Sequence, residues 1–325
     1  MIENSKPTSD PLSDLLRLAE VQAVVSGELR AGGAWALRFP PPSGLKFMAI
    51  VRGRGWLRLD GQADALCLNE GDVLLMNWAS PYELMSEAGA PTQDATALFS
   101  ALDPANRVLV LGDASEGASF QQIGGHVRMD SEQGASLVSL LPATFIAPAD
   151  TPEAPMLHWL MARLVEERAP RRPGHAAVAM RLAQMLFLQT LRMHLARADA
   201  LPCGWLRAMA DPRLLPAMQH MHAEPGRDWQ LDELARSCAM SRTSFAVRFK
   251  SVAGLAPLAY LTQWRMMLAQ HALRHDDRPL GAWVGDLGYA SDSAFSHAFR
   301  RIVGMSPAQY RRLPRVAAEE HPVAA

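Results

Sequence analysis

The sequence predicts an α+β protein of two domains: an all-β N-terminal barrel with linker helices after it, and an all-α C-terminal domain. Three observations support this prediction. The chain has 325 residues, which corresponds to two domains at about 100–200 residues each. Short apolar runs separated by turn residues fill residues 31–130, whereas helical periodicity dominates from residue 156 onwards. The last third of the chain contains an internal repeat.

The N-terminal region has the pattern of a sandwich or barrel, because its apolar runs are short and are punctuated by Gly, Pro and Asp. The expected strands include residues 34–39, 45–51, 56–59, 65–68 and 73–76. Four prolines between residues 142 and 155 then indicate a boundary.

Two segments after this boundary, 156–167 and 176–198, have helical periodicity. The second carries an apolar stripe, which consists of Met180, Ala183, Phe187, Leu191 and His194. Such stripes either cover the barrel or join two chains. We expect a homodimer that forms through these helices.

The internal repeat has an offset of 50 residues and matches at seven positions. The pairs are Ser241 and Ser291, Phe245 and Phe295, Phe249 and Phe299, Lys250 and Arg300, Gly254 and Gly304, Pro257 and Pro307, and Tyr260 and Tyr310. Each copy predicts a short helix, a turn, a serine N-cap and a second helix that ends at a glycine. This is the helix-turn-helix pattern, whose second helix enters the major groove of DNA.

The elements of the two copies follow from the same spacing. The first copy is expected to have a helix at 231–238 and a turn at 239–240, and the second a helix at 280–287 and a capped helix at 292–302. A long amphipathic helix at about 258–275 joins them. Such a rigid connector would hold the two second helices at a fixed separation.

The charge distribution is consistent with a polyanionic partner for this segment. Residues 211–315 hold 14 Lys and Arg against 9 Asp and Glu, a balance of +5, although the whole chain has a formal charge of −1. Basic side chains are expected to contact phosphates and to supply affinity. They are Arg242, Arg248, Lys250, Arg300, Arg301, Arg311 and Arg312.

Three runs, SRTSFAVRFK at 241–250, GYASDSAFSHAFRR at 288–301 and GMSPAQYRR at 304–312, resemble the DNA-binding domain of AraC-type transcription regulators. The resemblance covers about residues 211–313. It implies seven helices with two helix-turn-helix units, double-stranded DNA as a partner, and activation through contact with RNA polymerase. The base-reading positions of the family map onto Arg242, Thr243, Ala246, Val247, Asp292, Ser293, Ser296 and His297.

The N-terminal region resembles the cupin-type sensor domain of one AraC subgroup, on the runs WLRLDG at 56–61 and EGDVLLM at 70–76. The resemblance implies a small barrel that senses a signal. Cupins that bind metal carry histidines where this chain has Phe47, Met48, Trp78 and Tyr82, so we expect no metal, no cofactor and no enzymatic activity. Members of the subgroup often carry a cysteine where this chain has Gly124.

Six large side chains in and around these runs could line a pocket for a small effector or could simply fill the barrel. They are Phe47, Met48, Trp56, Met76, Trp78 and Tyr82. The three cysteines form no CxxC motif, and the sequence does not indicate whether any of them is redox-active.

The sequence therefore predicts a cytoplasmic, sequence-specific transcription regulator that responds to an effector, activates transcription and forms a homodimer. Residues 1–150 would form the cupin-like sensor domain, 151–205 the linker and dimerisation helices, 206–315 the double helix-turn-helix domain and 316–325 a disordered tail. No run reaches the roughly 20 apolar residues of a membrane helix, so no membrane partner is expected. Two alternatives remain open: a ligand-independent regulator controlled by a partner or by its abundance, and a cupin enzyme fused to a DNA-binding module.

Overall fold

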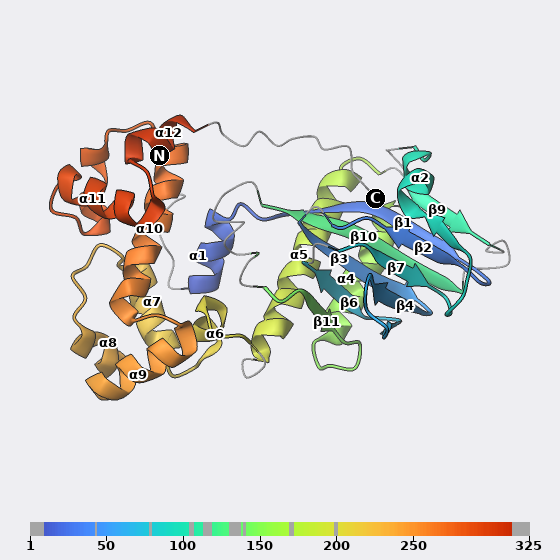
Figure 1. Cartoon of the computed structure of the whole chain (residues 1–325), viewed down its shortest axis with the longest axis horizontal. Helices are drawn as coiled ribbons and strands as arrows, with labels where there is room; N and C mark the ends of the chain where they lie inside the picture. The colour runs from blue at the N-terminus through green and yellow to red at the C-terminus, as the bar shows by residue number, and fades with distance from the viewer. Residues whose placement is uncertain are drawn as a thin grey trace. The chain divides into compact units, whose positions relative to one another are not determined.

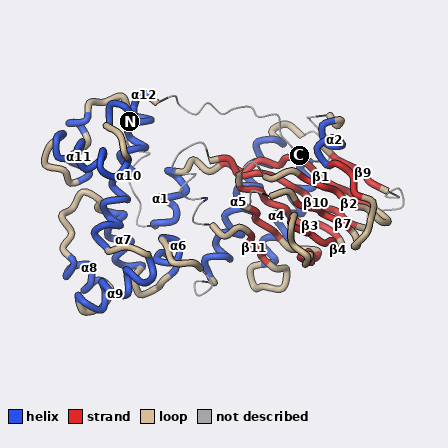
Figure 2. The backbone as a smooth tube through the Cα atoms, in the orientation of Figure 1, coloured by secondary structure: helices blue, strands red, loops and turns tan. Residues whose placement is uncertain are grey.

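The computed structural model describes residues 10–42, 44–77, 80–103, 107–112, 119–129, 138, 141–168, 172–197 and 201–313. The described residues divide into two compact units. The barrel unit lies within 21–129 and 141–194, and the helical unit comprises 10–20, 138 and the residues from 195 onwards. The strands belong to the barrel unit, whereas the helical unit contains only helices and loops among the described residues (Figures 1 and 2). The expected tail at 316–325 lies outside the described residues.

The barrel unit is built on two β-sheets. In the described residues, one sheet has the strand order β11-β6-β3-β10-β1-β9 and the other β5-β4-β7-β2-β8. The strands are β1 (Gln22–Ala31), β2 (Ala36–Phe39), β3 (Leu45–Arg52), β4 (Arg54–Leu59), β5 (Leu66–Asn69), β6 (Val73–Met76), β7 (Tyr82–Met85), β8 (Thr92–Asp94), β9 (Val108–Leu111), β10 (Phe120–Arg128) and β11 (Thr144–Ala147). The unit also contains the helices α2 (Ala95–Ser100), α4 (Ala154–Arg168) and α5 (His175–Ala196). The five expected strands and two expected helices are confirmed to within two residues at each end.

The alternation of side chains along β3 separates two faces of its sheet. Met48 and Ile50 pack in the core between the sheets, whereas the ring of Phe47 lies against Gly125 of the neighbouring strand β10. A Cβ atom on Gly125 would lie 2.2 Å from Phe47 Cε1 and 2.4 Å from the carbonyl oxygen of Val24. Only glycine therefore fits at position 125 without displacement of its neighbours.

The helical unit has two hydrophobic cores, one for each helix-turn-helix copy. Its elements are α1 (Pro11–Leu18), α6 (Trp205–Ala210), α7 (Leu215–Ala223), α8 (Leu231–Ser237), α9 (Arg242–Ala253), α10 (Pro257–His275), the 3₁₀ turns η4 (Leu280–Ala282) and η5 (Gly285–Leu287), α11 (Asp292–Val303) and α12 (Pro307–Arg312). The connector helix α10 contributes Tyr260, Leu261 and Trp264 to the first core and Met266, Ala269 and Leu273 to the second.

The second copy begins differently from the expectation. Residues 280–287 form two 3₁₀ turns rather than one α-helix. Gly281 and Gly285 explain this difference, because each glycine disfavours the helix by about 1 kcal/mol relative to alanine. Trp283 and Val284 are nevertheless buried in the second core, so the turns still anchor the copy.

Helix α1 packs in the helical unit. From the sequence, its residues were expected to belong to the sensor domain at 1–150. Leu15 and Leu18 belong to the core of the first copy. Asp14 and His222 are fully buried, with Asp14 Oδ2 3.1 Å from His222 Nδ1, while His222 Nε2 is 2.6 Å from the hydroxyl of Tyr260. Burial lowers the pKa of His222, and the hydrogen bond and charge of Asp14 oppose this shift. The three side chains thus connect α1, α7 and α10.

We predict that Gly125→Ala destabilises the protein by at least about 1–3 kcal/mol, because the added methyl group must displace backbone and a buried ring. Gly124→Ala is the matched control, since a Cβ there would meet nothing closer than 3.5 Å. Denaturant unfolding of both variants checks the prediction. Equal stability of the two would contradict the close packing at Gly125.

We also predict that Asp14→Ala lowers the free energy of unfolding of the helical unit by about 1–3 kcal/mol, because it leaves Nδ1 of the buried His222 without its partner. Asp60→Ala is the control, since Asp60 is exposed on the barrel unit. Thermal unfolding measures both effects, and an unchanged melting temperature for Asp14→Ala would show that the buried contact adds nothing.

Candidate nucleic-acid interface

Helices α9 and α11 expose the same positions. From Ser241 to Lys250 and from Ser291 to Arg300, the sequence of exposed, partly buried and buried residues is identical at all ten positions. The buried positions are the repeated phenylalanines, which are 0 % exposed. The sequence repeat is therefore a structural repeat, and Figure 1 shows α10 running between the two copies.

Capping and aromatic packing fix the orientation of each helix. The hydroxyl of Ser241 accepts a hydrogen bond from the backbone N–H of Ser244, and Ser291 caps α11 in the same way. Gly254 and Gly304 end the two helices with φ of 81° and 86°, a left-handed conformation that favours glycine. The ring centroids of Phe249 and Tyr260 lie 5.8 Å apart, and those of Phe299 and Tyr310 5.6 Å apart.

The outward face of α9 combines one cation with apolar surface. Arg242 and Thr243 are exposed, Ala246 is partly buried, and Val247 is 65 % exposed. The guanidinium of Arg242 lies 3.7 Å from the carboxylate of Asp232, and both side chains are well exposed. Such an ion pair contributes little to stability, so Arg242 can exchange this partner for another at small cost.

The outward face of α11 is polar. Asp292, Ser293 and His297 are exposed, and Ser296 is partly buried. These side chains offer hydrogen-bond donors and acceptors, whereas Ala246 and Val247 offer methyl groups at the equivalent positions of α9. The two faces therefore share one pattern of exposed and buried residues but differ in the chemistry of their side chains.

The basic residues expected to contact phosphates differ in their surroundings. Lys250, Arg300 and Arg301 are exposed on α9 and α11. Arg248 is held at 2.8 Å from Asp211, which is 6 % exposed and follows the end of α6. This ion pair fastens α9 to α6, so Arg248 has a positioning role within the unit that the sequence pattern did not indicate.

A second candidate site lies between the sheets of the barrel unit. The rings of Phe39 and Tyr82 stack with centroids 4.9 Å apart, and Lys46 Nζ lies 4.9 Å from the Phe39 centroid and 5.5 Å from that of Tyr82. Burial lowers the pKa of Lys46 to about 8. The pocket is lined by Ser26, Gly27, Phe39, Lys46, Met48, Tyr82, Phe99, Gln122 and Gly124.

Gln122 gives this pocket an unused acceptor. Its side chain is 4 % exposed, and its Oε1 accepts no hydrogen bond from any residue that the structure describes. A buried acceptor without a donor is costly, and such groups often mark a ligand or water site. The pocket thus combines a cation, an unpaired acceptor and aromatic walls.

The six side chains suggested for an effector pocket are not brought together. Met48 and Tyr82 line the pocket, and Met76 packs in the surrounding core. Phe47 lies against Gly125, away from the core that contains Met48, and Trp56 packs against Ala36, Met85 and Ala90. Trp78 lies outside the described residues.

Phe39 and Gln122 are pocket residues that the sequence did not reveal. Part of the pocket lining could have been predicted from strand alternation, because alternation places Lys46 on the same face of β3 as Met48. The contribution of Gln122 depends on the register between β10 and β3, which pairs Gln122 with Ile50. That register could not be read from one sequence.

All three cysteines are free thiols. Cys67 and Cys203 are exposed and Cys238 is buried. Burial raises the pKa of the Cys238 thiol.

In the part of the chain that is described, no helix has both the length and the apolar character needed to cross a membrane.

Comparison with known proteins identifies both units. Residues 10–196 match the cupin family, and residues 234–313 match a helix-turn-helix domain. The chain is similar to an AraC-like transcription regulator of Streptomyces antibioticus, with 36% identity over 305 residues, which cover 94% of this chain and 99% of that protein. It is also 30% identical to the transcriptional regulator AlkR of Acinetobacter baylyi, over 87% of this chain and 93% of AlkR.

Among solved structures, the DNA-binding domain of AdpA in complex with a target DNA is 33% identical, covering 31% of this chain and 91% of that chain with a TM-score of 0.30. The relatives are regulators of transcription rather than enzymes. The N-terminal cupin unit, the C-terminal pair of helix-turn-helix copies and the full-length relatives together establish that this chain belongs to the AraC-like transcription regulators.

Proposed function

We propose that this regulator reads two DNA half-sites, about one helical turn apart, with α9 and α11, and that a small molecule in the barrel unit controls its effect on transcription. The identical exposure of the two capped helices carries the first part of the proposal. Two recognition helices on one rigid connector suit two major-groove segments on one face of the duplex, about 34 Å apart.

The proposed contacts are of two kinds: contacts to phosphates, which supply affinity, and contacts to bases, which supply specificity. Lys250, Arg300 and Arg301 would bind phosphates, because they are exposed cations on the recognition helices. Arg242 would read guanine, and the methyl groups of Val247 would contact thymine. On α11, Ser293, Ser296 and His297 would make polar contacts, and Asp292 would accept from cytosine or stabilise the helix N-terminus.

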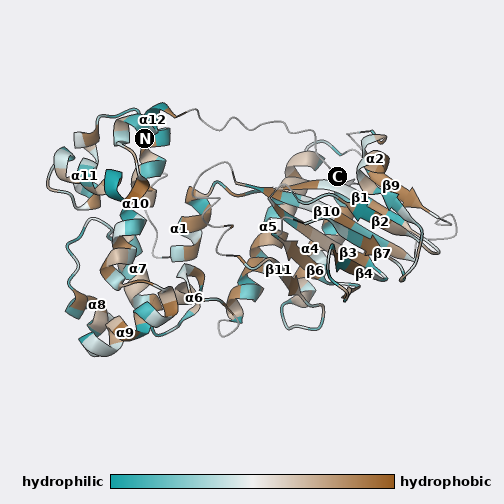
Figure 3. Cartoon of the chain, viewed as in Figure 1, coloured by the Kyte–Doolittle hydropathy of each residue, from teal (hydrophilic) through white to brown (hydrophobic). Residues whose placement is uncertain are grey.

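Four members of the expected α5 stripe, Ala183, Phe187, Leu191 and His194, are buried within the chain. Support for a homodimer therefore comes from other, exposed apolar residues of α4 and α5. Met156 and Trp159 on α4 are 46 % and 54 % exposed, and Val178, Met180 and Met185 on α5 are 37–44 % exposed. Figure 3 shows hydrophobic stretches along both helices. A second copy of the chain would cover this surface. The proposal also includes activation through RNA polymerase and action on DNA in the cytoplasm.

The pocket of the barrel unit is the proposed effector site. Lys46 would pair with an anionic group and Gln122 Oε1 would accept a hydrogen bond from the ligand, which together suit a small carboxylic acid with a hydroxyl or amino group. A ligand-independent regulator is the alternative, in which the pocket is only a packing defect. Binding to the pocket distinguishes the two.

The two recognition helices should affect different base pairs. We predict that Arg242→Ala relaxes base preference in one half-site and His297→Ala in the other, each by about 1–3 kcal/mol per lost base contact. Selection of sites from a random duplex pool with each variant measures this. Lys250→Ala is the control, because loss of a phosphate contact weakens binding without a change of preference. Altered preference at the same base pairs in both variants would refute the two-groove arrangement.

The effector proposal predicts a dependence on Lys46 and on pH. Screening small carboxylates for increases in melting temperature should identify a ligand that protects the wild type and not Lys46→Met. Arg58→Met, an exposed cation on β4, is the control and should keep the increase. Since the charged form of Lys46 is lost as the pH rises through about 8, the increase should shrink between pH 7 and pH 9.5.

The lowered pKa of Lys46 also determines how the stability of the ligand-free protein changes with pH. Because the folded-state pKa of Lys46 lies below its ordinary value of 10.5, the buried charge costs stability below about pH 8, and this cost fades as the pH rises towards 10.5. Lys46→Met should therefore be more stable than the wild type at pH 7, with a smaller difference at pH 10. A Lys46→Met variant that keeps the ligand response would show that the ligand binds outside this pocket, whereas the absence of any stabilising ligand would favour the ligand-independent alternative.

A further inference from the structure

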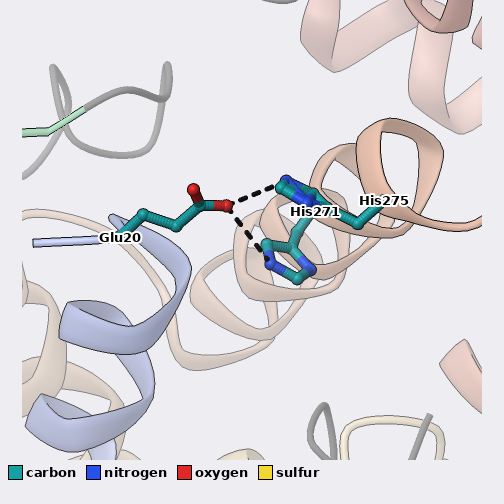
Figure 4. A group of neighbouring side chains, drawn as sticks. All are labelled: Glu20, His271 and His275. Carbon is teal, nitrogen blue, oxygen red and sulfur yellow. Dashed lines mark ion pairs between the residues drawn. The ribbon is translucent and has the colours of Figure 1, made fainter. Parts of the chain in front are cut away.

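Two histidines and a glutamate lie close together at the C-terminal end of the connector helix α10. His271 and His275 lie one turn apart on α10, and Glu20 follows the C-cap residue of α1. Glu20 Oε1 lies 2.9 Å from His275 Nε2 and 3.9 Å from His271 Nε2. One ligand atom from each of the three residues lies within 4.8 Å of the others, and Figure 4 shows the carboxylate facing both rings.

We propose that Glu20, His271 and His275 form a binding site for a divalent transition-metal ion of the Zn²⁺ type. Two imidazoles and one carboxylate are a set of three protein ligands that zinc accepts, with water in the fourth position. The spacing of four residues on an α-helix places both rings on one face, as the site requires. None of the three residues belongs to the proposed DNA-reading faces or lines the barrel pocket.

Binding of an ion would require the side chains of the cluster to rotate. Tetrahedral zinc with bonds of about 2.0 Å places its ligand atoms about 3.3 Å apart. The present separations of 2.9 Å and 3.9 Å bracket this value. The rings of His271 and His275 now stack in parallel, with centroids 4.3 Å apart and 10° between planes, so rotation about their side-chain torsions would direct both nitrogens at one ion.

The surroundings can accept the charge of the ion. Arg17 on α1 is close enough to act on His271 electrostatically, but its guanidinium lies 3.1 Å from the carboxylate of Asp14 and is largely compensated there. His271 is 19 % exposed and His275 45 % exposed, so an ion can enter from solvent and keep a water ligand. The two imidazole nitrogens favour Zn²⁺, Co²⁺ or Ni²⁺ over Mg²⁺ and Ca²⁺.

The backbone conformation at Glu20 helps to position its carboxylate. Glu20 has a φ of +49°, in the left-handed region that residues other than glycine rarely adopt. A left-handed residue directly after the C-cap is a common way for a helix to end. Here the conformation ends α1 and turns the carboxylate towards α10.

The position of the site indicates what the metal would do. Glu20 is the last residue of the helical unit before Val21 begins the barrel unit. His275 is the last residue of α10 and precedes the second helix-turn-helix copy. The ion would therefore fasten α1 to the connector helix at the point where the chain leaves the helical unit. Its occupancy would stabilise the docking of α1.

The test is calorimetric titration of the full-length protein, after dialysis against a chelator, with ZnCl₂ and CoCl₂. We expect one ion per chain, with about 100-fold or greater loss of affinity in His271→Gln, His275→Gln and Glu20→Gln. His220→Gln is the matched control, because His220 is an exposed histidine outside the cluster and should leave binding unchanged. MgCl₂ should give no binding at the same concentrations.

Two further readouts separate this site from a thiolate site and from a simple ion pair. The absorption spectrum of bound Co²⁺ should lack a thiolate charge-transfer band, which separates this site from binding at the exposed Cys67 or Cys203. Zn²⁺ should raise the melting temperature of the wild type and not of Glu20→Gln, a substitution that keeps the size of the side chain. Equal Zn²⁺ affinity in the wild type and all three variants, or no binding at Zn²⁺ concentrations up to the millimolar range, would show that the cluster is only an ion pair beside a histidine.

Discussion

The helical unit depends on one constraint: α10 belongs to two hydrophobic cores at once. Trp264 is fully buried in the first core, and Phe295 packs with Ala269 and Leu273 in the second. The 19 residues of α10 correspond to about 28 Å of helix. Because each recognition helix is capped and packed against its own core, the separation of the two helices is set by the length of α10. The proposed DNA-reading surfaces thus belong to one packed unit rather than to two tethered modules.

The barrel unit shows a different balance between stability and function. Gly125 permits the ring of Phe47 to approach the strand, which is a packing requirement. Lys46 and Gln122 instead lower the stability of the fold, because burial of a cation and of an unpaired acceptor in a largely apolar core costs free energy. Groups that weaken a fold persist where they have another use. This contrast supports the assignment of the pocket, and not the aromatic residues as a group, to ligand binding.

The sequence predicted most of the local structure, although the helix expected at 280–287 is wrong. The caps at Ser241 and Ser291, the glycines that end both helices and the strand boundaries follow from neighbouring residues. Contacts between distant segments could not be predicted: Asp14 and His222 are 208 residues apart, and nothing in an eight-residue amphipathic helix specifies its partner. The sequence led us to expect no metal, although the four-residue spacing of His271 and His275 is compatible with a pair of ligands on one helix. Glu20 joins this pair only through the docking of α1.

The docking of α1 also constrains how such a chain can be divided or recombined. The first segment of the polypeptide completes the core of the last domain, so the chain passes through the helical unit, then through the barrel, and back again. A chimera that exchanges everything before residue 205 would bring a foreign α1 to a native α7 and α10. Substitutions at Leu15 or Leu18 would then have to be matched by substitutions on α7 and α10. The boundary at which two regulators can be interchanged is therefore discontinuous in sequence, with one break near residue 20 and another near residue 195.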